Sequence, residues 1–292
     1  MKVAYLACAD VLTTTPKRRV DAYEHDRELE AFTPAFAARG LELTEVDWRA
    51  CDPAAFDLIF LRTCWDYTDH EAEFLAFLDR AQAVSRVAND PTLVRWNLSK
   101  LYLRELAAKG LPVIPSLFTD TAIPLAEAFE RLGADELVLK PVVGSSGFGQ
   151  ARTALADARG QVLEPDRFAQ PLIPEISTWG EVSLIFAGGV YSHAVRKTAG
   201  AGDYRIHVMH GGAEHAHQAS AAEIAVGQAF IDALPVQPLA ARVDLVPHGG
   251  GWLLMEVEAI EPHLFPQYAP DIGERLAQAI LTLATASPTA RP

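Results

Sequence analysis

The chain has 292 residues, half of them hydrophobic, so it can bury the cores of two or three structural units. Its net charge of −13 argues against a nucleic-acid partner, because a phosphate backbone would be repelled. The three cysteines lack metal-ligand spacing and indicate reduced thiols, and the apolar runs are too short for a signal peptide or a membrane span. We therefore expect a cytoplasmic protein without a membrane partner.

The first 90 residues alternate between strand and helix patterns, and this alternation predicts a small parallel sheet. Helical spacing stops at Gly40, which is a typical helix end. The expected strands are 2–9, 43–46 and 56–61, and the expected helices are 28–39 and 70–83.

A polar and aromatic cluster follows the last of these strands, at the edge where open parallel sheets bind ligands. It contains Arg62, Asp66 and Tyr67. A guanidinium group grips a carboxylate in bidentate fashion, and a carboxylate pairs with an ammonium group. The cluster therefore predicts a site for a small zwitterionic substrate. The alternative is an ion pair between Arg62 and Asp66 at the rim.

A helix is expected over 92–108, with Lys100 on it and Gly110 as its C-terminal stop. A compact α+β unit follows, between prolines at both ends, and we interpret it as a mobile lid. Its expected elements are a strand at 113–117, a helix at 123–132, strands at 137–141 and 150–154, and an apolar segment at 168–173.

The central feature of this unit is an apolar strand that ends in Lys140 and Pro141 and then opens into a flexible loop. The loop matches neither the P-loop nor the Rossmann pattern, because the lysine precedes the glycines and no helix pattern follows. Such a backbone is able to lie directly against phosphates, so the loop predicts a phosphate-binding site. The alternative interpretation is a plain surface hairpin loop. The loop residues are Gly144, Ser145, Ser146, Gly147 and Gly149.

The last third of the chain predicts an antiparallel sheet. Its expected strands are 181–187, 190–197, 239–246 and 252–259, and its expected helices are 221–234 and 272–284. In a final hairpin centred on Gly250, Asp244 stands opposite Glu256, and Glu258 points to the same face. Clustered carboxylates repel one another unless a cation neutralises them, so the hairpin predicts a Mg²⁺ site, with an ordinary solvated sheet face as the alternative.

The lysine strand with its glycine loop, the earlier lysine and the hairpin of acids together resemble the ATP-grasp superfamily of ligases over roughly residues 90–265. The resemblance implies an α/β and α+β fold. Its parts would be an N-terminal parallel-sheet substrate domain (1–110), a small α+β lid (111–174), a C-terminal antiparallel-sheet catalytic domain (175–286) and a disordered tail (287–292).

The resemblance also implies roles for single residues. Glu258 stands where glutathione synthetases of this superfamily usually carry asparagine. For the nucleotide, the resemblance implies phosphate contacts for Lys100 and Lys140 and a covering loop from Gly144 to Gly149. It also implies adenine contacts along 168–173, with Gln170, Leu172 and Ile173, and ribose contacts for Glu181. For the reaction, it implies catalysis by Arg205 with Arg196 and Lys197, and metal ligation by Asp244, Glu256 and Glu258.

Three further motifs resemble the glutathione-synthetase-like branch that includes the O-ureido-serine cyclo-ligase of D-cycloserine biosynthesis. They span 62–67, 192–205 and 255–262. The branch implies ATP and one or two Mg²⁺, with Mn²⁺ able to substitute. It also implies that a carboxylate or ureido oxygen is phosphorylated and then displaced by an amine, with ADP and phosphate released, between molecules or by ring closure. The alternatives are a kinase-like outcome and a nucleotide-binding module without catalysis, and a homo-oligomer stays open.

Overall fold

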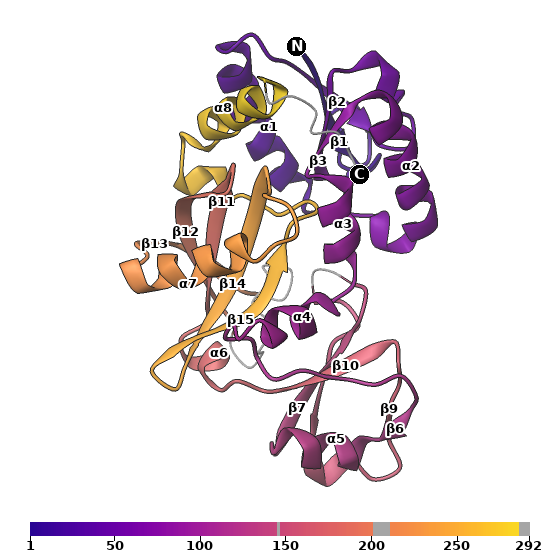
Figure 1. Cartoon of the computed structure of the whole chain (residues 1–292), viewed down its shortest axis with the longest axis vertical. Helices are drawn as coiled ribbons and strands as arrows, with labels where there is room; N and C mark the ends of the chain where they lie inside the picture. The colour runs from indigo at the N-terminus through magenta and orange to yellow at the C-terminus, as the bar shows by residue number, and fades with distance from the viewer. Residues whose placement is uncertain (145–146, 201–210, 286–292) are drawn as a thin grey trace.

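The computed structural model describes residues 1–144, 147–200 and 211–285. The parallel sheet lies at one end of the molecule, a five-stranded sheet lies in the middle and a small sheet lies at the opposite end (Figure 1). The fold is therefore mixed α/β and α+β, as predicted. The predicted tail at 287–292 lies outside the described residues.

The N-terminal sheet has the order β2-β1-β3-β4, and all its strands are parallel, which confirms the prediction. Helix α1 begins at Ala22, six residues before the expected start, and Pro34 lies inside it. The strands are β1 (Lys2–Ala7), β2 (Glu42–Asp47), β3 (Leu58–Thr63) and β4 (Arg86–Ala88), and the helices are α1 (Ala22–Ala37) and α2 (Glu71–Val84).

The single helix predicted over 92–108 is two helices, α3 (Pro91–Leu98) and α4 (Tyr102–Ala108). The break lies at Lys100, whose backbone N–H donates to Val142 O at 2.7 Å. The side chains of Leu93 and Tyr102 pack in the core beneath the five-stranded sheet. Val94 and Leu98 of α3 pack instead in the core of the N-terminal domain, so α3 contacts both cores.

The small unit is an antiparallel sheet of order β5-β10-β7-β8 with a two-stranded sheet of β6 and β9 beside it. The strand predicted at 113–117 is shorter and begins later, because Val113 instead bridges to Leu254 of the central sheet. The elements are β5 (Leu117–Phe118), β6 (Ile123–Pro124), α5 (Leu125–Leu132), β7 (Glu136–Pro141), β8 (Ala151–Ala154), β9 (Val162–Leu163) and β10 (Arg167–Pro171).

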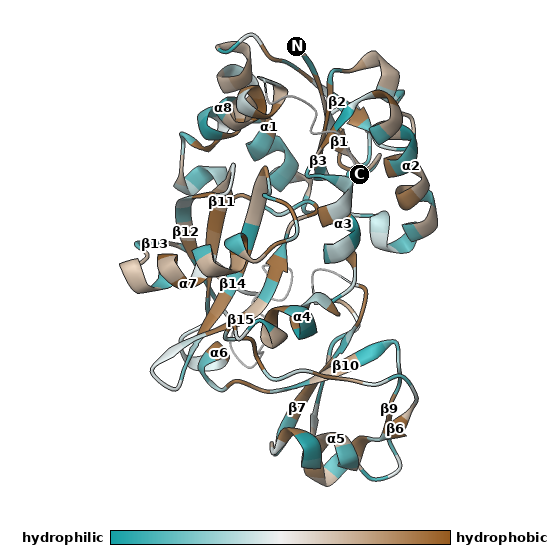
Figure 2. Ribbon diagram, viewed as in Figure 1, coloured by the Kyte–Doolittle hydropathy of each residue, from teal (hydrophilic) through white to brown (hydrophobic). Residues whose placement is uncertain are grey.

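The central sheet is antiparallel, with the order β13-β12-β11-β14-β15, and apolar residues concentrate in β11 and β14 (Figure 2). A capping box between Ser220 and Glu223 starts α7. The elements are α6 (Glu175–Thr178), β11 (Glu181–Ala187), β12 (Val190–Thr198), β13 (Ala213–His217), α7 (Ala221–Asp232), β14 (Ala240–His248), β15 (Gly251–Glu258) and α8 (Ile272–Thr285).

Helix α8 returns to the N-terminal sheet and packs against α1. A side chain at Gly273 would bring its Cβ within 2.6 Å of Ala31 O, so the two helices are close enough to require glycine there. One core consequently runs from the N-terminal sheet to one face of the central sheet, through residues such as Ile185 and Leu276. The two domains are thus joined by buried apolar contact.

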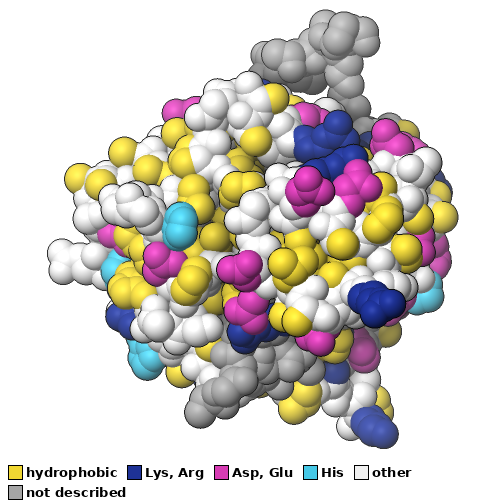
Figure 3. Space-filling model, turned by 90° about the horizontal axis from the view of Figure 1, so that it is seen from below, with side chains coloured by type: hydrophobic (Ala, Val, Ile, Leu, Met, Phe, Trp, Pro, Cys, Tyr) yellow, Lys and Arg dark blue, Asp and Glu magenta, His cyan; other side chains and the backbone are white. Residues whose placement is uncertain are grey.

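None of the helices in the described ranges is both long enough and apolar enough to cross a membrane. On the face seen in Figure 3, acidic and basic side chains are interspersed with apolar ones. Single exposed apolar residues, such as Val20 and Val84, are ordinary for a folded domain.

Candidate active site

A cleft is lined by side chains from all three parts of the molecule: Tyr67 from the N-terminal domain, Lys140 from the small sheet and Glu256 from the central sheet. The structure brings twelve of the predicted site residues together around it. They are Tyr67, Lys100, Lys140, Gly144, Gly147, Gln170, Leu172, Ile173, Glu181, Lys197, Glu256 and Glu258. Ser145, Ser146 and Arg205 lie outside the described residues.

The two predicted phosphate lysines have different surroundings. Lys100 Nζ bonds to Glu256 Oε2 at 2.9 Å. Although burial disfavours its charge, that carboxylate raises the pKa of Lys100 well above its ordinary value. Lys140 has no carboxylate within 4.0 Å among the described residues, and burial lowers its pKa. Lys140 is therefore a cation in the cleft whose charge the described part of the chain leaves unpaired.

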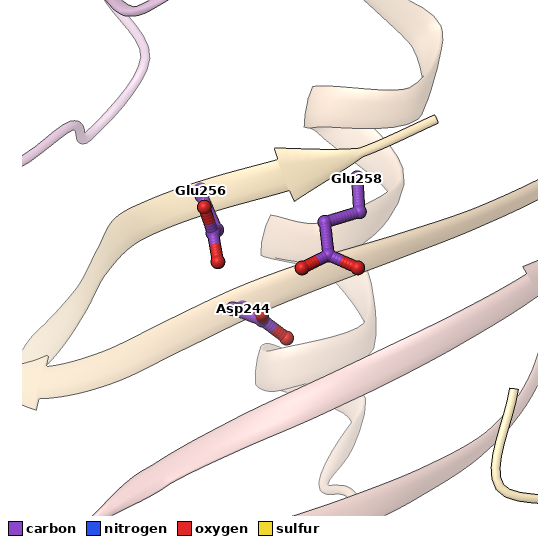
Figure 4. Close-up of side chains that lie close together, drawn as sticks. All are labelled: Asp244, Glu256 and Glu258. Atoms are coloured by element: carbon purple, nitrogen blue, oxygen red, sulfur yellow. The ribbon is translucent and has the colours of Figure 1, made fainter. Parts of the chain in front are cut away.

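The hairpin carboxylates are arranged as predicted, with Asp244 opposite Glu256 and Arg242 opposite Glu258. The three acids each offer an oxygen within 4.8 Å of the others (Figure 4). Arg242 lies between two of them, with Nη2 at 2.9 Å from Asp244 Oδ2 and 2.5 Å from Glu258 Oε1. The donor set, with oxygens only, fits Mg²⁺.

The surrounding charges shift the pKa values of these acids in different directions. Burial opposes ionisation of Glu256, but Lys100 and Arg242 outweigh it and lower its pKa to about 2. Burial, together with the charge of Glu256, raises the pKa of Glu258 to about 7 despite Arg242. Asp244 is 1 % exposed and also accepts from Ser183 Oγ at 2.5 Å. Glu256 and Glu258, which line the cleft, are thus the acids best placed to meet a bound ion.

Lys197 joins the acid cluster to the proposed ribose position. Its Nζ pairs with Glu181 and lies 3.6 Å from Asp244 Oδ2. Burial raises the pKa of Glu181 to about 7, even with the lysine beside it. Arg196, predicted as a catalytic residue, does not line the cleft, because adjacent strand residues point to opposite faces. It donates instead to Trp179 O at 2.9 Å.

The loop after Lys140 requires glycine for a steric reason. A Cβ at Gly144 would lie 2.8 Å from Cγ of Pro141. Gly149 has φ +71° and does not line the cleft, so its phosphate contact stays a prediction. Gln170 is 1 % exposed and donates to Ser116 Oγ at 2.9 Å, so its side chain is held inside the small sheet while its backbone belongs to strand β10.

The predicted substrate cluster is not assembled as expected. Arg62 is 1 % exposed, does not line the cleft and forms a bidentate pair with Glu28. Asp66 bonds to Arg49 at 2.5 Å and to the indole N–H of Trp48 at 2.7 Å. Both the substrate roles and the alternative Arg62–Asp66 pair are therefore corrected, because each charge has another partner. Tyr67 alone reaches the cleft, largely buried.

Other charged residues line the cleft that the sequence reasoning missed. Glu24 fell outside the helix expected at 28–39 because α1 begins at Ala22. His263 gave no sequence signal, while Glu261 lay inside the 255–262 motif without an assigned role. Burial, with Glu214 adding negative charge, raises the pKa of Glu24 to about 7. Burial and Glu258 raise the pKa of Glu261 to about 8.

Comparison with known proteins identifies relatives of the whole chain. Residues 3–89 match a family model described as the N-terminal domain of D-cycloserine synthetase DcsG. The cycloserine biosynthesis protein DcsG of Streptomyces lavendulae is 32% identical over 281 residues, which cover 87% of this chain and 93% of that protein.

Solved structures agree with this relationship. The crystal structure of D-cycloserine synthetase DcsG superposes with a TM-score of 0.80 at 28% identity, covering 97% of this chain and 100% of that one. A RimK domain ATP-grasp protein from Sphaerobacter thermophilus has a TM-score of 0.65 at 21% identity, covering 96% and 100%, and shares the fold. The chain therefore belongs to the family of the cycloserine biosynthesis protein DcsG, and it shares its fold with ATP-grasp proteins.

Proposed function

We propose that this enzyme is an ATP-dependent cyclo-ligase that acts on O-ureido-serine, in the chemistry that leads to cycloserine. One observation carries the proposal: Lys100, Lys140 and the hairpin acids converge on a single cleft, in a chain 32% identical to a cycloserine biosynthesis protein. The substrate class is a small zwitterion, and neither nucleic acid nor a membrane is a partner. A homo-oligomer is compatible with this function.

ATP, when bound with one or two Mg²⁺ or with Mn²⁺ in their place, supplies a phosphoryl group that turns a carboxylate or ureido oxygen into a leaving group for an attacking nitrogen. The chain's own part is charge neutralisation and positioning. Lys140, unpaired among the described residues, meets phosphate oxygens directly. Lys100, already beside Glu256, shares its charge between that acid and the phosphates.

The carboxylates perform a second task. Glu256 is held ionised by Lys100 and Arg242, so it presents a fixed negative charge to a cation at the edge of the cleft. Glu258 lies beside it and shares Arg242 with Asp244. The backbone of β10 and of 172–173 offers hydrogen bonds to a purine base, and Glu181 offers carboxylate oxygens to ribose hydroxyls.

The test is turnover by the full chain with ATP, Mg²⁺ and either enantiomer of O-ureido-serine. ADP and phosphate are measured by coupled assay, and the organic product is identified by mass spectrometry. ADP formed in proportion to a cyclised product supports the proposal. ADP with a phosphorylated but uncyclised product indicates a kinase-like reaction. No ADP with either enantiomer rejects the proposed substrate and favours a nucleotide-binding module.

A further inference from the structure

The segment that follows the metal hairpin is held by one buried ion pair. Arg62 Nη2 donates to Pro262 O at 2.6 Å, and the Leu264 N–H donates to Glu28 Oε1 at 3.4 Å. These two bonds bracket His263. The pair thus fixes the backbone on both sides of a residue that lines the cleft.

The ion pair itself is built from two separate elements of the N-terminal domain. Arg62, on β3, donates to Glu28 on α1 through Nε at 2.9 Å and Nη2 at 2.5 Å, and each side chain is 1 % exposed. The hydroxyl of Tyr5 donates at 2.8 Å to Glu28 Oε2, the oxygen that also accepts from Arg62 Nε. We call Glu28 and Arg62 the clamp.

A buried ion pair is a poor way to gain stability, because removing two charges from water costs about as much as their attraction returns. Its bidentate geometry, however, fixes direction as well as distance. Here the clamp also bonds to the backbone of 262–264, through Arg62 Nη2 and Glu28 Oε1, while the buried Nη1 of Arg62 has no described hydrogen-bond partner. The observation therefore points to positioning of this segment.

The positioned segment contributes to a negatively charged part of the cleft. We call Glu24, Glu261 and His263 the acidic wall. Neither glutamate has a lysine or arginine within 4.0 Å in the described ranges, whereas nearby Arg19 is bonded to Asp21. His263 Nδ1 lies 3.7 Å from Glu24 Oε2, and its buried Nε2 has no described hydrogen-bond partner.

The negative charge of the acidic wall favours the ammonium group of a zwitterion over its carboxylate. Glu214 and Asp21 both add negative charge around Glu24, so an ammonium group would replace repulsion with attraction. A substrate carboxylate would instead meet further repulsion at the acidic wall. The opposite charge lies at Lys140, toward the phosphate end of the same cleft.

We propose that the clamp positions the acidic wall, and that this wall binds the ammonium group of the substrate. The inference deepens the proposed function and rests on it for the identity of the substrate. Within it, Glu24 and Glu261 contact the ammonium group, while Glu28 and Arg62 act through the segment that they hold.

The first experiment compares two substrates that differ in one group. O-ureido-serine and its deamino analogue, with hydrogen in place of the amino group, are tested with wild type and Glu261→Gln by ADP release. We expect Glu261→Gln to raise KM about tenfold for the amine-bearing compound and less than twofold for the analogue, with unchanged affinity for ADP and Mg²⁺. Equal changes for both compounds, or no change, would overturn the ammonium assignment.

The second experiment tests the clamp with Arg62→Met, and with Arg62→Lys and Tyr5→Phe as milder changes that retain more of the network. Amide hydrogen exchange at Leu264 should accelerate at least tenfold more than exchange in β14, and KM for O-ureido-serine should rise about tenfold with kcat less affected. In a double-mutant cycle, Arg62→Lys and Glu261→Gln should be non-additive in KM.

The matched control is Phe77→Leu, a buried change on α2 in the same domain. It should lower Tm without changing KM or exchange at Leu264. If the clamp variants lower Tm but behave like this control in exchange and KM, the clamp is only a structural ion pair. Exchange at Leu264 needs no substrate, so it decides the clamp even if O-ureido-serine gives no ADP and the proposed function fails. In that case, equal calorimetric binding of both compounds with ADP and Mg²⁺ would overturn the ammonium assignment.

Discussion

The carboxylates at the two ends of the cleft have different charged neighbours. At the central sheet, Glu256 is paired with Lys100 and Asp244 with Arg242. At the end formed by α1 and the segment after β15, Glu24 and Glu261 have no such cationic partner among the described residues. The first end therefore has its own internal balance of charge, and the second has a surplus of negative charge that a cationic ligand would neutralise.

The pKa values of two glutamates show that cationic neighbours can outweigh the effect of burial. Glu24 and Glu256 are the same residue type and both line the cleft. Burial and Glu214 raise the pKa of Glu24 to about 7, whereas Lys100 and Arg242 overcome burial and lower the pKa of Glu256 to about 2. Glu256 thus holds its charge before any ligand binds, whereas Glu24 gains its charge most readily together with a cation.

The largest effect on activity is expected from a substitution at the central-sheet end of the cleft, where the carboxylates are paired with cations. Glu256→Gln should lower kcat at least about 100-fold while nucleotide binding persists, because the amide cannot hold Mg²⁺ with a full negative charge during phosphoryl transfer. ADP release and ADP affinity measure the two effects. The control is Glu136→Gln, which alters an exposed ion pair with Arg152 between β7 and β8 of the small sheet. Wild-type turnover by Glu256→Gln at millimolar Mg²⁺ would contradict the metal assignment.

A smaller loss is expected from Lys140, the lysine that no described carboxylate pairs. Lys140→Ala should weaken ATP binding roughly 30-fold, the loss of one to two charge-assisted contacts, because its charge is directed at the ligand alone. Isothermal calorimetry with a non-hydrolysable ATP analogue measures it. The control is Lys2→Ala, because Lys2 is an exposed lysine far from Lys140 in the sequence. An unchanged affinity would show that Lys140 does not meet phosphate.

The sequence was informative where local geometry decides the outcome. The predicted pairing of Asp244 with Glu256 is correct, but the turn lies at 249–250 with His248 opposite Gly251, and a register shift between Asp244 and Leu245 completes the pairing. Lys140 could likewise be placed at a strand end from its apolar run and the glycines after it. These predictions depended on residues within a few positions of one another.

The substrate end depended on contacts that span the chain. Arg62 looked suited to a ligand, but its partner Glu28 is 34 residues away, and the backbone that it holds is 200 residues away. The helix expected through Lys100 breaks because its N–H is taken by Val142 O, a tertiary bond. Periodicity carries no information about such partners, so the clamp and the acidic wall became visible only in three dimensions.

The smallest expected effect is on thermal stability, and it compares Glu24 at one end of the cleft with Glu256 at the other. A carboxylate with a raised pKa contributes most to folding below the pKa it has in the unfolded chain, near 4.5, and that contribution is lost as pH rises through about 7. Glu24→Gln removes this loss, because the amide stays neutral. The variant should therefore melt a few degrees above wild type at pH 8 and close to it at pH 4.5, an effect bounded by about 3 kcal/mol.

Glu256→Gln is the matched contrast, since the same substitution removes a carboxylate whose pKa is lowered. Its charged form stabilises the fold above pH 4.5 and loses that contribution as pH falls toward 2, so this variant should melt below wild type at pH 7 and approach it in acid. Scanning calorimetry of both variants from about pH 2 to about pH 8 gives the two signs and the acid limit for Glu256→Gln. If both variants lose stability at pH 8, Glu24 has a cationic partner that stabilises its charge, and the two ends of the cleft do not differ as described.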